Sequence, residues 1–381
     1  MAELSRFIPL ARHEIRTEDL EAVSDALRSG RLALGPWVRQ FEERLADYVG
    51  VRHTVAVNSG TSALHLITRA LGIGSADEVI TTPFSFVAST NAILFERATP
   101  VFADIDPESL CIDPEQVERA ITPRTKAILA VDVFGRPADW PALEKIAQAH
   151  DLALIEDSAE ALGSELDGRR CGSFGRAGIF GFYPNKQITT GEGGAVVTDD
   201  DALADLCRSM ANQGRGDEST WLQHVRLGFN YRLDEMSGAL GCSQLGRIDG
   251  FIETRARVAA WYADILADVG GVVLPTAAFP GRMSWFVYVV RLSDEYTRED
   301  RDAILEGLGA RGIGCSDYFQ PIHLQPFVRK TLGTKAGDYP VTEAVGARTI
   351  ALPFFVSLTQ NDVGFVAECL AELMQSRGVR R

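Results

Sequence analysis

One lysine of this sequence lies in a setting that could give it covalent chemistry. Lys186 follows the apolar run Phe180–Phe182 and precedes the glycine-rich turn Gly191–Gly194. A lysine held between a strand and such a loop is partly desolvated, and desolvation favours the neutral amine that Schiff-base chemistry requires. A solvated lysine in a hairpin loop has the same local sequence, so this motif alone leaves both interpretations open.

An acidic residue ends a second apolar run. Asp157 follows Ile155 and Glu156 at the end of a predicted strand. A carboxylate there could keep the pyridine nitrogen of pyridoxal 5'-phosphate (PLP) protonated, which lets the ring act as an electron sink. A carboxylate that caps a helix or faces solvent is the alternative. In the company of Lys186, Asp157 favours a PLP site.

A third segment could bind the phosphate of such a cofactor. Gly60, Thr61 and Ser62 form a glycine turn between a strand and a helix that opens with hydroxyl residues. The amides and the dipole at a helix start attract anions, although Ser and Thr also cap helices that bind no ligand. The chain has no G-x-x-x-x-G-K-[ST] and no G-x-G-x-x-G motif between strand and helix, so nucleotide cofactors have no support. Phe86, which follows another strand, could stack on a flat ring or simply pack in the core.

These residues all follow predicted strands, and that position suits a particular fold. Helical stretches separate most of the strand candidates, which are Thr54–Val57, Glu78–Thr81, Pro100–Ala103, Ala127–Val131, Ala153–Glu156, Gly178–Phe182 and Ala195–Thr198. The alternation predicts an α/β fold with a mainly parallel, helix-covered sheet. Ligands of such sheets bind at the carboxyl ends of the strands.

The sequence changes character after Arg232. Long amphipathic helices are expected over Asp234–Ile248 and Ile252–Val269, followed by a strand at Trp285–Leu292. Further helices are predicted over Arg298–Leu308 and Gln360–Gln375. We therefore expect a large domain over residues 1–248 and a smaller C-terminal α/β domain over residues 249–381.

Composition excludes several classes of protein. The 381 residues carry 38 Lys and Arg against 52 Asp and Glu, a net charge of -14, so nucleic acid and anionic membranes are poor partners. The sequence has neither a signal-like N-terminus nor the ~20 apolar residues that span a bilayer, which predicts a cytoplasmic protein. Its six cysteines form no C-x-x-C pair and its histidines no H-x-x-x-H pair, so we expect no metal.

Taken together, these segments resemble the DegT-like family of nucleotide-sugar aminotransferases, which are fold-type-I PLP enzymes of the aspartate aminotransferase superfamily. The resemblance extends to three more segments, which are Ser29–Pro36, Gly228–Glu235 and Pro321–Pro326. It implies a fold with a seven-stranded, mainly parallel sheet in the large domain. It also implies transfer of an amino group from L-glutamate to a keto-sugar nucleotide, with pyridoxamine phosphate as the intermediate form of the cofactor.

The resemblance also implies roles for single residues. Lys186 would bind PLP covalently and move protons, and Asp157 would pair with the pyridine nitrogen. The remaining cofactor contacts implied are ring stacking by Phe86, a phosphate cup of Gly60, Thr61 and Ser62, and Glu160 near the phenolic oxygen. Asn230 would reach the phosphate of the neighbouring subunit, which implies a homodimer with shared active sites and leaves tetramers open. Substrate-side candidates are Arg31 and His323, for which a surface position is the alternative.

Two features bear on affinity and substrate. Gly181 stands where many members of the family carry a serine, so one phosphate hydroxyl is missing. The run Tyr183–Gly194 resembles the GDP-perosamine synthase subgroup, which aminates GDP-4-keto-6-deoxymannose. Three alternatives stay open: a dTDP- or UDP-keto-sugar aminated at C3 or C4, a keto-inositol, and a non-catalytic binding protein on the same fold. The family also has a branch in which histidine replaces the lysine and the reaction is a dehydration. Lys186 indicates that this chain does not belong to that branch.

Overall fold

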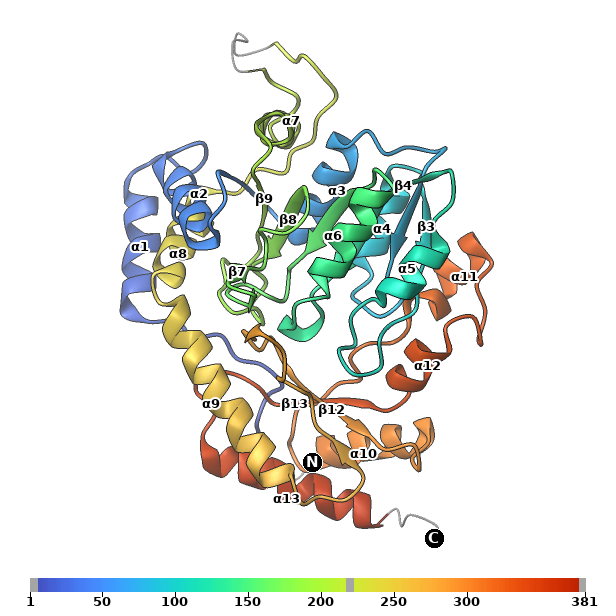
Figure 1. Cartoon of the computed structure of the whole chain (residues 1–381). Helices are drawn as coiled ribbons and strands as arrows, with labels where there is room; N and C mark the ends of the chain where they lie inside the picture. Colours follow the sequence, from blue (N-terminus) through green and yellow to red (C-terminus); the bar gives the residue numbers. More distant parts are fainter. Residues whose placement is uncertain (1–5, 217–222, 377–381) are drawn as a thin grey trace.

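A seven-stranded sheet forms the centre of the molecule (Figure 1). The computed structural model describes residues 6–216 and 223–376. The strand order is β1-β9-β8-β5-β4-β2-β3. Strand β9 runs in the direction opposite to that of the other six strands. The predicted mainly parallel sheet is thus confirmed. Its strands are β1 (His53–Val57), β2 (Glu78–Thr81), β3 (Thr99–Phe102), β4 (Thr125–Val131), β5 (Ala153–Asp157), β8 (Ala177–Gly181) and β9 (Gly194–Thr198).

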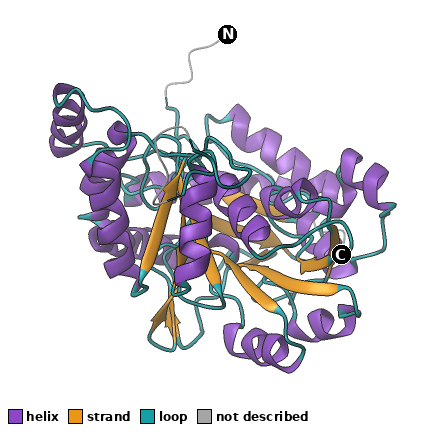
Figure 2. Ribbon diagram, turned by 90° about the horizontal axis from the view of Figure 1, so that it is seen from above, coloured by secondary structure: helices purple, strands orange, loops and turns teal. Residues whose placement is uncertain are grey.

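Helices cover this sheet on both faces (Figure 2). Four of them connect successive strands, namely α3 (Gly60–Ala70), α4 (Ala88–Phe95), α5 (Pro114–Ala120) and α6 (Trp140–Ala149), and α7 (Asp201–Ala211) follows the last strand, β9. Side chains of Asp113, Asp139 and Asp200 accept hydrogen bonds from first-turn amides and so fix where α5, α6 and α7 begin. Because both faces are covered, β4 is buried throughout except at Lys126.

A group of N-terminal and central helices flanks the β1 edge. It consists of α1 (Thr17–Arg28), α2 (Pro36–Val49) and α8 (Glu235–Leu245), which α9 (Ile248–Leu266) follows. The buried Glu235 carboxylate accepts hydrogen bonds from Gly35 N and Trp37 N, both at 2.8 Å. A residue of α8 thereby caps the N-terminus of α2, the helix against which α8 packs. The sequence predicted one helix over Asp234–Ile248, but the chain turns at Gly246, which ends α8.

The C-terminal part has its own small sheet, of order β10-β12-β13. Its strands and main helices are β10 (Val272–Val273), β12 (Tyr288–Leu292), β13 (Thr349–Leu352), α10 (Arg298–Ala310) and α13 (Gln360–Ser376). The expected strand at Trp285–Leu292 begins later because Trp285 has a φ of 55°, outside the extended region. The smaller elements are β6 (Glu165–Leu166), β7 (Arg169–Arg170), β11 (Gly281–Arg282), α11 (Pro326–Leu332) and α12 (Pro340–Gly346).

The N-terminal segment packs on this C-terminal part. Ile8 forms a bridge to Ile313, and Leu10 O accepts a hydrogen bond of 2.9 Å from Phe354 N. A segment of the predicted large domain (residues 1–248) therefore packs against the predicted C-terminal domain (residues 249–381). Within the described residues, every helix is too short or too polar to cross a bilayer.

We predict that Gly194→Ala destabilises the fold by about 3 kcal/mol, since its new Cβ would lie 2.4 Å from Gly60 N. That nitrogen belongs to a backbone turn and cannot rotate away. Gly181 pairs with Gly194 in the sheet, and a Cβ there would meet nothing closer than 3.6 Å, so Gly181→Ala is the matched control. Urea unfolding of both variants measures the cost. Equal stability of the two variants would contradict this account of the turn.

Candidate active site

A cavity of about 480 Å³ opens at the carboxyl ends of the central strands. The first turn of α3 contributes Gly60 and Thr61, the end of β5 contributes Asp157, and the loop after β8 contributes Lys186. The structure thus brings together residues more than 120 positions apart in the sequence, as the parallel sheet predicts. Other lining residues include Ser85, Phe86, Glu160, Asn185, Phe286, Tyr318 and Phe319.

The Lys186 amine lies between a carboxylate and an aromatic ring. Its Nζ is 3.5 Å from Glu160 Oε1 and 3.9 Å from the centroid of Phe286. Only 15% of the lysine side chain is exposed, so these two neighbours define its surroundings. Glu160 is fixed in turn, because its Oε2 accepts a hydrogen bond of 2.9 Å from Phe134 N. The solvated-lysine alternative therefore does not describe this side chain.

Asp157 is nearly buried and faces the same cavity. Burial raises the pKa of its carboxyl to about 7; the Ala159 amide lowers it, the Glu160 carboxylate raises it, and the Lys186 amine lowers it. Burial likewise raises the pKa of Glu160, against the opposing effect of Lys186. Two buried carboxyls therefore share the positive charge of one nearby lysine, and the site favours a further cationic group.

A buried network fixes the strand end that carries Asp157. Ser158 Oγ lies 2.6 Å from Asp132 Oδ2 and 2.7 Å from Glu156 Oε1, so one hydroxyl bridges two carboxyls. A hydroxyl has one proton to donate, and the second contact needs a proton on a carboxyl. Burial raises the pKa of Asp132, and burial with the Asp132 charge raises that of Glu156. The hydroxyl bridge and the raised pKa values favour a proton on this carboxyl pair, and the bridge anchors β5 to the loop after β4.

Thr61 and Ser62, the two hydroxyl residues that the sequence assigned to phosphate binding, lie in the first turn of α3 but have different surroundings. Ser62 N is capped by Ser59 Oγ at 3.0 Å, and Ser62 Oγ donates to Asn58 Oδ1 at 2.7 Å. Ser62 therefore shapes the turn, whereas Thr61 lines the cavity with Gly60. The phosphate-binding roles of Gly60, Thr61 and Ser62 stay predictions, and of the two hydroxyls only that of Thr61 belongs to a residue that lines the cavity. A serine at position 181 would fit sterically, as the nearest atom to a Cβ there is 3.6 Å away.

Aromatic side chains form much of the cavity wall. Phe86 is 63% exposed and lies at the cavity, where a ring could cover a flat ligand. Phe286, Tyr318 and Phe319 also line the cavity, although sequence reasoning did not identify them. The only available signal was the aromatic pair Tyr318–Phe319 just before Pro321, within the C-terminal part.

Besides Ser62, three predicted residues lie outside the cavity of this chain. Asn230 is exposed, and its backbone oxygen accepts a hydrogen bond of 3.4 Å from Asn58 Nδ2 beside the phosphate turn. Arg31 is exposed and donates to Leu34 O. His323 is fully buried, with Nε2 at 3.0 Å from Glu343 Oε1. A surface position is thus wrong for His323, and the functional roles of these residues stay predictions.

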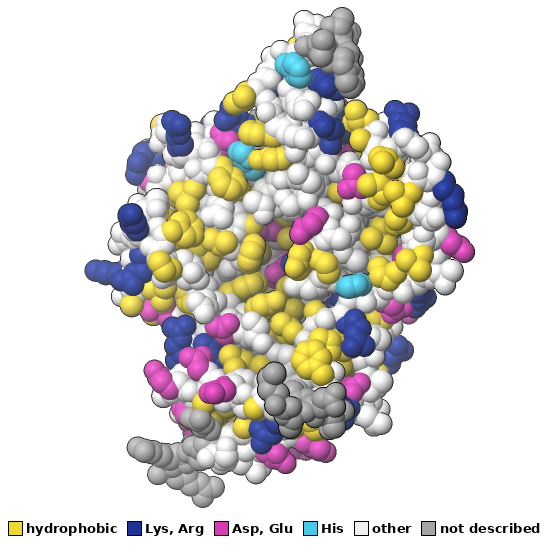
Figure 3. Space-filling model, turned by 180° about the vertical axis from the view of Figure 1, so that it is seen from behind, with side chains coloured by type: hydrophobic (Ala, Val, Ile, Leu, Met, Phe, Trp, Pro, Cys, Tyr) yellow, Lys and Arg dark blue, Asp and Glu magenta, His cyan; other side chains and the backbone are white. Residues whose placement is uncertain are grey.

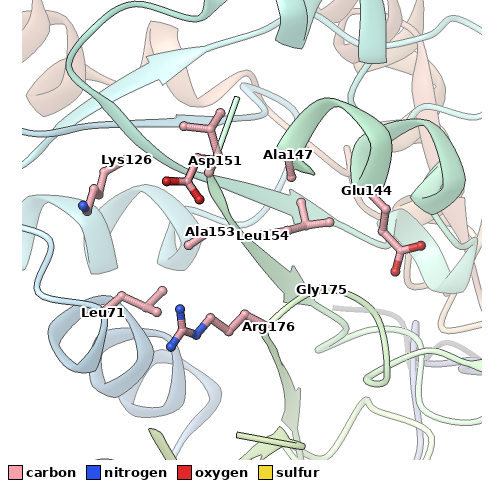
Figure 4. Close-up of a pocket in the computed structure, with 10 residues that line it drawn as sticks. Leu71, Lys126, Glu144, Ala147, Asp151, Ala153, Leu154, Gly175 and Arg176 are labelled. Carbon is pink, nitrogen blue, oxygen red and sulfur yellow. The ribbon is translucent and has the colours of Figure 1, made fainter. Parts of the chain in front are cut away.

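A second hollow of about 530 Å³ lies at the opposite edge of the sheet, where β4 and β5 begin (Figure 4). Two of its charged side chains are already paired, since Arg176 contacts Asp200 at 2.8 Å and Glu144 contacts Arg169 at 3.0 Å. The carboxyl-edge cavity is therefore the candidate active site.

The cavity has a partner for each functional group of PLP. Lys186 offers an amine for the aldehyde, Asp157 a carboxyl for the ring nitrogen, and Thr61 a hydroxyl for the phosphate. Asn185 Oδ1 is buried and lacks a hydrogen-bond partner among the described residues, so a ligand donor could satisfy it. The residues present fit the cofactor.

We predict that PLP-free protein loses stability as pH rises from about 4 to about 7, because the folded state favours the protonated Asp157 carboxyl. The raised pKa means that folding binds a proton in this range, so the cost of the buried charge is complete above pH 7. Urea unfolding between pH 4 and pH 8 should show a smaller decline in Asp157→Asn, while the exposed-site variant Asp25→Asn follows the wild type. The same decline in Asp157→Asn as in the wild type would refute the assignment.

Comparison with known proteins agrees with this site. Residues 13–371 match the DegT/DnrJ/EryC1/StrS aminotransferase family. The spore coat polysaccharide biosynthesis protein SpsC of Bacillus subtilis is 36% identical, covering 97% of this chain and 98% of SpsC. GDP-perosamine synthase of Caulobacter vibrioides is 38% identical, covering 90% of this chain and 91% of the synthase.

Solved structures extend the comparison to fold and cofactor. PseC of Helicobacter pylori, an aminotransferase of pseudaminic acid biosynthesis, superposes with a TM-score of 0.93 at 32% identity, over 97% of this chain and 100% of PseC. A putative sugar aminotransferase of Streptococcus pneumoniae in its PLP form has a TM-score of 0.92 at 27% identity, over 97% and 99% of the two chains. The expected fold and cofactor are confirmed. The chain belongs to the DegT/DnrJ/EryC1/StrS family of PLP-dependent sugar aminotransferases.

Proposed function

We propose that this aminotransferase moves the amino group of L-glutamate to GDP-4-keto-6-deoxymannose and so forms GDP-perosamine, a deoxyamino sugar nucleotide. The observation that carries the chemistry is the approach of Lys186 and Asp157 to one cavity. Similarity to GDP-perosamine synthase over 90% of the chain supports the acceptor, as does the run Tyr183–Gly194.

Lys186 and Asp157 divide the work of the reaction. When bound, PLP supplies an electron sink and carries the amino group between the two substrates. Asp157 holds a proton on the ring nitrogen, and the positive charge so created favours its own ionised form. Lys186 Nζ removes the proton from Cα of glutamate and later returns a proton to the sugar carbon.

Neighbouring side chains hold the two reacting groups in place. Glu160 Oε1, at 3.5 Å from Lys186 Nζ, restrains the amine and balances its charge when protonated. The Phe286 ring bounds the amine at 3.9 Å and excludes water from it. Thr61 and the amides at the start of α3 bind the phosphate, and Phe86 covers the ring. Fixing these positions before reaction supplies the proximity that catalysis needs.

We also propose that the enzyme works as a homodimer with shared active sites. Large exposed hydrophobic side chains include Leu32, Leu34, Phe86, Tyr183 and Leu227. Figure 3 shows hydrophobic side chains gathered over the middle of one face of the molecule, as expected of a surface that a second copy covers. Asn230 then reaches the phosphate of the neighbouring subunit, while Arg31 and His323 belong to the segments that border the sugar nucleotide.

Mixing two inactive variants tests the shared site. Subunits with Lys186→Ala and subunits with Asn230→Ala each lack one half of every site in their own dimers. A mixed dimer regains one complete site, so equal mixing after reversible dissociation should restore about a quarter of wild-type activity. Activity that stays at the level of the separate variants would contradict sharing, and monomeric wild-type protein in sedimentation would contradict the dimer itself.

The acceptor is tested by following the absorbance of the cofactor through both half-reactions. We expect L-glutamate to convert bound PLP to pyridoxamine phosphate, and GDP-4-keto-6-deoxymannose to restore the PLP band rapidly. Lys186→Ala should slow both steps on the order of 10³-fold or more, since it removes the proton-transfer group.

The controls are the same experiments with dTDP- and UDP-linked keto-sugars and with a keto-inositol. Restoration of the band by one of those compounds alone would reject the GDP-sugar and retain the lysine mechanism. A protein that binds PLP but never responds to glutamate would reject the enzymatic function.

A further inference from the structure

A fully buried arginine binds the backbone of the proposed catalytic lysine. Arg255 lies on α9, and its Nη2 donates to Lys186 O at 3.3 Å. Its Nη1 donates to Trp285 O at 3.1 Å and to Phe286 O at 3.2 Å. One guanidinium therefore joins the loop after β8, the long helix α9 and the segment that leads to β12.

Removing the Arg255 guanidinium from water costs free energy. No carboxylate of the described residues forms an ion pair with it, and burial lowers the pKa of its guanidinium to about 10. The Phe354 ring, 5.6 Å from the guanidinium carbon, and the three carbonyls are the compensation. An apolar side chain of similar length would fill the same space without the desolvation cost. The position thus satisfies a requirement other than packing.

Two routes of contacts connect Arg255 with Lys186, one direct and one through Phe286, Phe134 and Glu160. Phe286, whose oxygen binds Arg255, donates through its nitrogen to Phe134 O at 3.2 Å. Phe134 N donates to Glu160 Oε2 at 2.9 Å, and Glu160 Oε1 lies 3.5 Å from Lys186 Nζ. The direct route is the hydrogen bond that Arg255 donates to Lys186 O. Both neighbours that define the place of the amine, Glu160 and Phe286, are linked to this one guanidinium.

The same contact restrains an unfavourable backbone conformation. Trp285 has a φ of 55°, a left-handed conformation that is unfavourable for a bulky L-residue. Arg255 binds the carbonyl of Trp285 and that of the next residue, so it holds the Phe286 ring against the lysine. Without these hydrogen bonds the segment is free to relax toward extended backbone, and the ring moves away from Lys186.

We propose that Arg255 is a positioning residue that fixes the Lys186 amine for covalent capture of PLP. In this step Nζ forms a double bond to the aldehyde carbon of PLP, and the aldehyde oxygen leaves as water with the two amine protons. The inference rests on the role proposed for Lys186. Arg255 touches neither cofactor nor substrate and acts through the lysine and the Phe286 ring.

The test separates capture of PLP from binding of a cofactor form that needs no lysine. Arg255→Lys keeps a cation but replaces the two carbonyl-binding nitrogens of the planar guanidinium with one, and Arg255→Met removes the charge at similar length. Arg257→Lys, at an exposed position two residues further along α9, is the matched control. For each PLP-free variant, stopped-flow absorbance gives the rate of PLP capture, calorimetry gives the affinity for pyridoxamine 5'-phosphate, and thermal unfolding reports the fold.

We expect Arg255→Lys to capture PLP at least about tenfold more slowly, because a small displacement of a reacting group has effects of this size. Its affinity for pyridoxamine 5'-phosphate should stay within about twofold of the wild type, since Thr61 and Asp157 are unchanged. Arg257→Lys should match the wild type in both measurements. If Arg255→Met does not fold, the result from Arg255→Lys decides.

Two outcomes overturn the proposal. Unchanged capture of PLP in folded Arg255→Lys shows that the lysine needs no such support, and equal loss of capture and of pyridoxamine 5'-phosphate affinity shows a general structural role. Capture of PLP by the wild type at a lysine other than Lys186 would instead reject the proposed function, so the two failures are distinguishable.

Discussion

Two buried carboxyls and one largely buried amine line the same cavity, and this shortage of positive charge governs the site. Asp157 and Glu160 both have raised pKa values chiefly through burial, while Lys186 is the cation in their midst. On the role proposed for Asp157, a protonated ring nitrogen supplies the missing charge and lets the carboxyl ionise, so that cofactor and protein stabilise each other. The same imbalance explains why the PLP-free protein should be sensitive to pH.

Maintaining this arrangement requires support from several layers of the fold. The parallel sheet delivers the ends of β5 and β8 to one edge, and the Ser158 bridge between Asp132 and Glu156 fixes the end of β5. The close approach of Gly194 to the start of α3 holds in place the residues proposed to bind the phosphate. On the proposal made here, Arg255 completes the support from the side of α9.

The sequence predicted what local patterns encode. Alternation of strands and helices identified all seven strands of the large sheet, and motif positions identified Lys186 and Asp157 as strand-end residues. It could not reveal that the Ser62 hydroxyl bonds to Asn58, because capping and ligand binding use the same residues. Nor could it reveal Arg255, which lies 69 positions from Lys186 on a helix whose pattern signals only packing. Such contacts arise from tertiary structure alone.

The central claim is that Lys186 is the residue that binds PLP covalently. Incubation with PLP, reduction with borohydride and peptide mapping by mass spectrometry tests it most directly, with PLP-free wild type and Lys186→Ala as references. We predict a single reduced adduct, on Lys186, with the exposed Lys126 unmodified at stoichiometric PLP. An adduct on another lysine, or the same yield in Lys186→Ala, would contradict the account.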